Sequence, residues 1–201
     1  IPYLNYIDDD AKEINAVNTI INDNDILKGY NTDILGVIDT FKTFDINVTD
    51  KNVLILGTGA TSNTIYHAVK KSGAKKIYKA YRDSSKTTGD ILYSDISKVY
   101  NDINIIINAT SNGMYPHADD KKLLDIINFK NLDAVMDVVY NPLRTRLLID
   151  AKNHNIKSVS GLYMLVSQAF FAYKLFNNMD ISNDSQSSKS CFDIGFQESH
   201  Q

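Results

Sequence analysis

The chemically most informative segment of the chain is a glycine-containing run, Gly57-Thr58-Gly59-Ala60-Thr61-Ser62. Glycines permit a tight turn and let the backbone approach a pyrophosphate, whose negative charge the N-terminus of a following helix stabilises. The run comes after an apolar stretch, residues 52–56, and before residues 61–72, whose apolar positions have helical spacing. This pattern predicts that residues 57–61 bind a dinucleotide; an ordinary strand-to-helix turn is the alternative.

The next expected strand, residues 76–81, ends at Tyr81-Arg82-Asp83, where the adenosine ribose of a dinucleotide is expected. A carboxylate at this place favours a free 2′-hydroxyl group, whereas an arginine favours a 2′-phosphate. Arg82 is one of only three arginines, and its planar guanidinium suits both phosphate pairing and stacking on adenine. We therefore predict NADP as the cofactor. Asp83 argues for NAD, and a solvated arginine at a strand end is the alternative to either.

Three further polar residues border apolar elements. Asp33 precedes the apolar stripe of residues 34–44 and is locally consistent with a helix N-cap. Gln168 has apolar neighbours three and four positions away on an expected helix, so its amide should face the buried side and bond to backbone or to a ligand. Tyr140 follows the apolar run 134–139, at the edge where a parallel sheet presents groups to ligands, although a plain turn would also place it there.

Periodicity places these residues on an alternation of strands and helices. Residues 52–83 form a strand-helix-strand unit whose two strands should be parallel neighbours. Apolar runs at 103–107 and 134–139, with helix-like stretches around 123–127 and 144–152, continue the alternation. The sequence therefore predicts an α/β fold, a Rossmann-like three-layer αβα sandwich with a parallel sheet.

Composition excludes several partners. The net charge is −3, and no block of five or more Lys or Arg residues occurs, so neither nucleic acid nor an anionic membrane surface is expected as a partner. Four scattered histidines and a single cysteine offer no spacing for metal ligands, and we predict no metal site. Residues 1–4 lack the cationic and apolar start of a secretory signal, and we expect a cytoplasmic protein.

Several separated motifs, in order, give the chain a resemblance to the shikimate dehydrogenase family over residues 1 to about 178. The motifs are Ala16-Val17-Asn18-Thr19, Gly29-Tyr30-Asn31-Thr32-Asp33, the glycine turn, Asn108-Ala109-Thr110-Ser111-Asn112-Gly113-Met114-Tyr115-Pro116, Asp137-Val138-Val139-Tyr140-Asn141-Pro142 with Thr145 and Leu147-Leu148, and Gly161-Leu162-Tyr163-Met164-Leu165-Val166-Ser167-Gln168-Ala169. The family reduces 3-dehydroshikimate to shikimate with NADPH, in the pathway to aromatic amino acids.

The resemblance implies roles for individual residues. Asp33 matches the carboxylate of the catalytic Asp/Lys pair, and the substrate contacts match Asn18, Asp33, Tyr140 and Gln168. The cofactor-binding positions match Gly57, Thr58, Gly59, Ala60, Thr61, Tyr81, Arg82, Asp83, Thr110, Val138 and Gly161. Thr110, Val138 and Gly161 correspond to the nicotinamide side, and Arg82 corresponds to the arginine that pairs with the 2′-phosphate.

One departure from the family pattern, together with the family's domain organisation, leads to further expectations. The chain begins after the segment that carries the family's acid/base lysine, so we expect cofactor binding with little dehydrogenase activity. We expect residues 1–34 to be the remnant of an α/β substrate-binding lobe, 35–160 to be the NADP-binding domain, 161–178 to be a helix returning to the first lobe, and 179–201 to be disordered.

Alternative functions are a quinate/shikimate dehydrogenase that uses NAD and a non-catalytic, dehydrogenase-like regulatory or binding module. Retention of Asp33 and Gln168 argues against the module, and absence of the lysine argues for it. Partner expectations are a small-molecule substrate and either a homodimer or a fused partner domain.

Overall fold

The computed structural model describes residues 1–82, 89–118, 121–181, 189–190 and 193. Asp83 and most of the segment predicted to be disordered lie outside the described residues. The chain divides into two compact units: Ile1–Asp45 with Tyr163–Gln201 form unit 1, and Ile46–Leu162 form unit 2.

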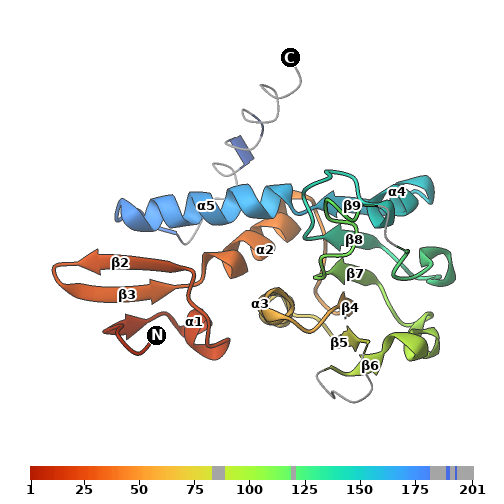
Figure 1. The fold of residues 1–201 in the computed structure, drawn as a ribbon, viewed down its shortest axis with the longest axis horizontal. Helices are drawn as coiled ribbons and strands as arrows, with labels where there is room; N and C mark the ends of the chain where they lie inside the picture. The colour runs from red at the N-terminus through yellow and green to blue at the C-terminus, as the bar shows by residue number, and fades with distance from the viewer. Residues whose placement is uncertain (83–88, 119–120, 182–188, 191–192, 194–201) are drawn as a thin grey trace. The chain divides into compact units, whose positions relative to one another are not determined.

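Unit 2 is built on a parallel six-stranded sheet (Figure 1). Its strands are β4 (Asn52–Leu56), β5 (Lys76–Tyr81), β6 (Ile91–Leu92), β7 (Ile105–Asn108), β8 (Ala134–Asp137) and β9 (Lys157–Ser160). The order across the sheet is β6-β5-β4-β7-β8-β9, and every neighbouring pair is parallel. This arrangement confirms the predicted sheet and the predicted pairing of β4 with β5.

Helices flank this sheet, as expected for strands that are buried on both faces. They are α3 (Ala60–Lys71), α4 (Arg146–Asn153) and the 3₁₀ helices η1 (Tyr93–Val99) and η2 (Ile126–Asn128). β7 and β8 are buried along their whole length, which explains why each is apolar up to its last residue.

The prediction of a helix over residues 123–127 is wrong, because only the short η2 forms there. Leu123 and Leu124 pack against the core of unit 2 from a non-helical segment, and Ile126 is buried in it. An apolar run this short cannot offset the cost of nucleating an α-helix, so contact with the core decides the local structure. The sequence also did not predict β6, η1 and β9.

Unit 1 combines a small sheet with two long helices. Its elements are β1 (Tyr6–Ile7), α1 (Asp9–Glu13), β2 (Thr19–Asp23), β3 (Ile26–Tyr30), α2 (Thr32–Thr43) and α5 (Leu162–Phe176). The sheet order is β1-β3-β2, and β2 and β3 form a hairpin whose turn residues, Asn24 and Asp25, have φ values of 50° and 67°. Asn and Asp are the residues that tolerate this backbone conformation best after glycine.

Helices α2 and α5 pack side by side (Figure 1). A Cβ on Gly36 of α2 would lie 2.9 Å from the carbonyl oxygen of Met164 in α5, so the glycine permits close packing. The carboxylate of Asp39 is buried and accepts hydrogen bonds from the Tyr163 hydroxyl at 2.9 Å and the Ser167 hydroxyl at 2.6 Å. Because of this packing α2 lies in unit 1, whereas the sequence-based division placed residues after 34 in the nucleotide-binding part.

Within the described part of the chain, no helix is long and apolar enough to cross a membrane.

Candidate functional site

In unit 1, Thr32 joins two of the predicted substrate residues. Thr32 is the first residue of α2, and its side chain is fully buried. Its hydroxyl lies 3.2 Å from Oδ1 of Asn18 and 3.4 Å from Oε1 of Gln168, and its backbone N–H donates to the same Asn18 oxygen at 2.9 Å. The backbone N–H and the hydroxyl of Thr32 therefore join Asn18 to Gln168, which is 150 residues away in sequence.

Asp33 follows in the first turn of α2 and is half-buried. Burial raises the pKa of its carboxyl, and a hydrogen bond from Asn18 partly opposes that rise. The predicted N-cap role belongs to Asn31 instead, whose side-chain oxygen accepts from the Ile34 N–H at 3.3 Å. Asp33 is therefore free of a capping function and lies next to Asn18.

Gln168 is half-buried, so the expectation of an inward-facing amide holds in part. Its Nε2 donates to the Leu165 carbonyl of its own helix at 2.9 Å, and its Oε1 accepts from Thr32. The structure thus provides a backbone partner and a side-chain partner for the amide. Asn18, Asp33 and Gln168 form one polar cluster in unit 1, with carboxylate and amide groups that suit a hydroxylated ligand.

In unit 2, the glycine turn connects β4 to α3. Gly57 has φ +107°, a conformation that favours glycine, and a Cβ there would lie 2.9 Å from the Thr110 methyl carbon. Gly59 is the N-cap of α3; it makes no side-chain cap hydrogen bond, and a Cβ on it would meet nothing within 4 Å. The start of α3 therefore has exposed backbone, open space above Gly59 and no acidic residue in its first turn. This is the environment that a pyrophosphate requires.

The end of β5 carries the predicted residues for the adenosine end of a dinucleotide. Tyr81 is the last residue of β5 and is half-buried, and Arg82 is exposed. The guanidinium carbon of Arg82 lies 5.8 Å from the ring centroid of Tyr93. No hydrogen bond or ion pair joins Arg82 to another residue in the described ranges.

At the ends of β7 and β8, a polar network holds the neighbouring loops. Asn108 and Asp137 are register partners, and Nδ2 of Asn108 donates to Oδ1 of Asp137 at 2.9 Å. The Val139 N–H donates to the same oxygen at 3.0 Å, and the Thr145 hydroxyl donates to Oδ2 at 2.6 Å. Oδ1 of Asn108 in turn accepts from the backbone N–H and the hydroxyl of Thr110, at 3.1 and 2.7 Å.

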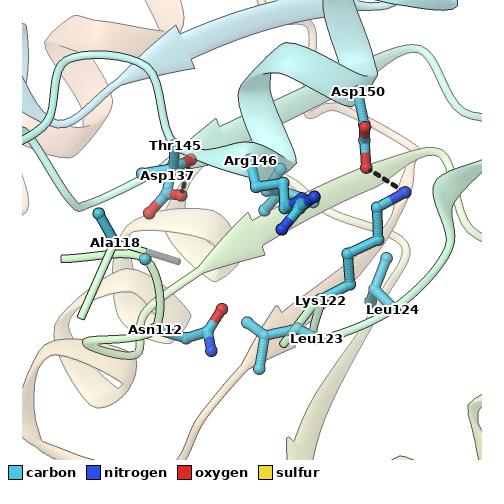
Figure 2. A pocket seen from close by; sticks show the side chains of 11 residues that line it. Asn112, Ala118, Lys122, Leu123, Leu124, Asp137, Thr145, Arg146 and Asp150 are labelled. Atoms are coloured by element: carbon cyan, nitrogen blue, oxygen red, sulfur yellow. Dashed lines mark hydrogen bonds and ion pairs between the residues drawn. The ribbon is translucent and has the colours of Figure 1, made fainter. Parts of the chain in front are cut away.

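Asp137 and Thr145 also line a small pocket beside α4, which is partly open to solvent (Figure 2). Arg146 lies in the middle of this pocket, and Lys122 pairs with Asp150 at 2.7 Å across it. Burial raises the pKa of the Asp137 carboxyl to about 6, although hydrogen bonds from Thr145, Val139 and Asn108 oppose the rise.

This pKa predicts a measurable pH dependence of stability. Between the ordinary value of 3.8 and about 6, the folded state binds the Asp137 proton more tightly than the unfolded state does, so this residue's contribution to stability falls as the pH rises. Relative to Asp137→Asn, the wild-type protein should lose about 2 kcal/mol of unfolding free energy between about pH 4.5 and about pH 7. Urea unfolding followed by circular dichroism measures the difference.

The matched control for that experiment is Asp125→Asn, because Asp125 is exposed. This variant gives the effect of removing an exposed carboxylate, against which the Asp137→Asn curve is compared. Parallel curves for wild type and Asp137→Asn would contradict a raised pKa at Asp137.

The remaining predicted residues lie just beyond the strand ends of unit 2. Val138 follows β8 and is half-buried, and Tyr140 has 46% of its surface exposed. Gly161 follows β9 and is buried against the Val138 backbone, where its N–H donates to the Val139 carbonyl at 3.2 Å. Thr110, Val138, Tyr140 and Gly161 are therefore all at the carboxyl edge of the sheet, as expected for ligand-binding loops.

Asn108, Asp137 and Thr145 belong to the family-like motifs, but no functional role was predicted for them from the sequence. The signal that marks the first two is a polar residue that ends an apolar strand, at Asn108 after residues 105–107 and at Asp137 after residues 134–136. Among the residues with described positions, no group of three or more His, Cys, Asp or Glu side chains could hold a metal ion.

Comparison with known proteins finds no family model that matches the sequence, but it finds similar proteins and structures. The shikimate dehydrogenase (NADP(+)) of Caldanaerobacter subterraneus subsp. tengcongensis is 35% identical over 195 residues, which cover 90% of this chain and 69% of that protein.

Two solved structures have the same fold. The first is a chorismate mutase/shikimate 5-dehydrogenase fusion protein from Clostridium acetobutylicum, with a TM-score of 0.87, 29% identity, and coverage of 98% of this chain and 72% of that one. The second is shikimate 5-dehydrogenase from Listeria monocytogenes in complex with shikimate and NAD, with a TM-score of 0.79, 25% identity, and coverage of 95% and 72%.

Proposed function

Because the chain belongs to the shikimate dehydrogenase family, we propose that it acts in the NADPH-dependent reduction of 3-dehydroshikimate to shikimate, a step toward aromatic amino acids. The observation that carries the proposal is the open glycine turn at the start of α3, together with the polar cluster of unit 1. The first feature supports a dinucleotide, and the second supports a hydroxylated ring.

In unit 1, Asn18, Asp33 and Gln168 would bind the substrate's hydroxyl groups. Thr32 fixes the Asn18 amide oxygen and restrains the Gln168 amide, so both side chains enter binding with part of their rotamer freedom already lost. The Asp33 carboxylate would accept a hydrogen bond from a substrate hydroxyl and orient it. Tyr140 of unit 2 is proposed as a further substrate contact.

The protein's own proton chemistry centres on Asp33. Its hydrogen-bond partner is Asn18, and Lys28, the lysine nearest to it in sequence, is instead paired with Asp23 at 2.6 Å. No lysine in the described part of the chain bonds to Asp33. We therefore assign Asp33 an orienting role and assign no proton-donating lysine to the described residues.

In unit 2, the backbone of Gly57, Thr58, Gly59, Ala60 and Thr61 would hold the pyrophosphate at the start of α3. Arg82 would pair with the 2′-phosphate, next to Tyr81 and Asp83, and Thr110, Val138 and Gly161 would line the nicotinamide end. When bound, NADPH supplies the hydride. The protein's contribution is to orient that end and to discriminate between the two dinucleotides.

The cofactor part of the proposal is tested by comparing NADPH with NADH. The wild-type protein should prefer NADPH, and Arg82→Ala should weaken NADPH binding by about 10- to 100-fold, because a charge-assisted pairing with phosphate is lost, while NADH binding changes little. The measurement is a titration followed by the fluorescence of the reduced nicotinamide.

Arg144→Ala is the matched control, because Arg144 is also exposed and has no assigned role. It should leave both affinities unchanged. A wild-type preference for NADH would overturn the role of Arg82 and favour the NAD-dependent alternative.

The family also suggests how this protein assembles and where in the cell it acts. The fusion protein from Clostridium acetobutylicum shows a related fold joined to another enzyme in one protein. We propose either a homodimer or a fused partner domain for this chain, which sedimentation of the intact protein would distinguish. A cytoplasmic location is proposed on the same family grounds.

A further inference from the structure

The carboxylate of Asp137 accepts hydrogen bonds from groups at the ends of β7 and β8 and at the start of α4. Its side chain has no exposed surface, and its two oxygens accept from Asn108, Val139 and Thr145. One of these donors lies on the neighbouring strand, one is the backbone just after β8, and one is the residue that caps α4. A single carboxylate thus ties together three segments at the carboxyl edge of the sheet.

The same network reaches the glycine turn. Asn108, which donates to Asp137, also fixes the backbone N–H and the hydroxyl of Thr110 through its own oxygen. The methyl group of Thr110 packs so closely on Gly57 that a Cβ there would lie 2.9 Å away. The positions of Thr110 and of the backbone at Val138 therefore depend on the Asn108–Asp137 pair.

We propose that Asp137 is a positioning residue for the nicotinamide half of the bound dinucleotide, acting through Asn108 on Thr110 and through the Val139 N–H on Val138. This role rests on the proposed function, because it requires that unit 2 binds NADP. Asp137 does not itself contact the cofactor in this assignment. It sets the separation between two loops whose residues do.

If Asp137 only filled space in the core, an apolar side chain would do so without the free-energy cost of burying a carboxylate. A buried carboxylate loses its hydration, and replacing buried charges by well-packed apolar groups is often neutral or stabilising. Here every bond that compensates for this loss goes to an element at the ligand-binding edge. Asp137 also lines the pocket beside α4, together with the charged residues Lys122, Arg146 and Asp150.

The test separates the two halves of the cofactor. Affinities are measured by isothermal titration calorimetry for NADP⁺ and for 2′-phosphoadenosine 5′-diphosphate, which lacks the nicotinamide and its ribose. Asp137→Ala should weaken NADP⁺ binding by about tenfold while the affinity for the fragment stays within about twofold, because only the nicotinamide loops move. Asp137→Asn should restore most of the affinity, since its amide can accept from Asn108 and Val139 and donate to Thr145.

Thr145→Ala is the second variant, in case Asp137→Ala does not fold. It removes only the 2.6 Å bond to Asp137 and the weak cap of α4, and it should give a smaller loss that is again confined to NADP⁺. Equal losses for both ligands, or no loss for either, would overturn the positioning role. If the wild-type protein bound neither ligand, the proposed function itself would fail and the inference with it.

Discussion

Replacing Gly161 by alanine is expected to destabilise the protein by about 3 kcal/mol or more, which would be the largest stability effect among the substitutions considered. A Cβ at this position would collide with the carbonyl group of Val138 and would lie 2.9 Å from its Cα atom. These are backbone atoms just beyond the end of β8, and they cannot move without displacing the bond between the Gly161 N–H and the Val139 carbonyl. We therefore expect the substitution to disrupt the contacts between Gly161 and residues 138–139 at the carboxyl edge of the sheet.

Urea unfolding of Gly161→Ala against wild type gives the measurement, and Gly73→Ala is the comparison. Gly73 has φ +83°, but a Cβ there would meet only Thr49, at 3.6 Å or more. It should cost about 1 kcal/mol from backbone strain alone. If the Gly161 variant were no less stable than the Gly73 variant, the close approach of Gly161 to Val138 would be wrong.

Replacing Gly59 by alanine should leave stability unchanged and weaken NADPH binding by about 100-fold. Gly59 has φ −78° and ψ −174°, which alanine adopts without strain, and its Cβ would project into empty space. If a pyrophosphate lies against this backbone, the added methyl group occupies the place of a phosphate oxygen and blocks the N–H groups at the start of α3. A loss of NADPH binding without a loss of stability would identify the turn at Gly59 as the pyrophosphate-binding site.

Thermal unfolding and NADPH titration on the same preparation check both halves of this prediction. The Gly73→Ala variant again provides the control, because Gly73 follows the opposite end of α3. Its NADPH affinity should equal that of wild type in spite of its lower stability. Undiminished NADPH binding by Gly59→Ala would mean that the pyrophosphate does not lie on this turn.

The strand-turn-helix core of unit 2 could be predicted because its signals are local. Residues 53–56 are continuously apolar, Gly57 and Gly59 mark the turn, and the spacing of 61–72 is helical. The predicted strand 76–81 matches β5 at both ends. β9 was not predicted, because Lys157-Ser158-Val159-Ser160 contains only one large apolar residue. This segment forms a strand because it pairs with β8.

The candidate site was predictable where a single residue carries the signal, and not where two strands share it. Gln168 stands out as an amide among apolar neighbours, and Arg82 stands out because arginine is rare in this chain. The Asn108–Asp137 pair depends on the register between β7 and β8, which no local pattern reveals. The role of Thr32 likewise depends on the approach of Asn18 and Gln168 from distant parts of the chain.

The buried carboxylate of Asp39 has a consequence for the order in which the polypeptide is completed during synthesis. Two hydroxyl groups that bond to it, those of Tyr163 and Ser167, come 124 and 128 residues later in the chain. These two hydrogen bonds cannot form before Tyr163 and Ser167 are synthesised, and all of residues 46–162 precede them in the chain. The nucleotide-binding sheet can therefore mature first, and the discontinuous unit formed by the two ends of the chain is finished last.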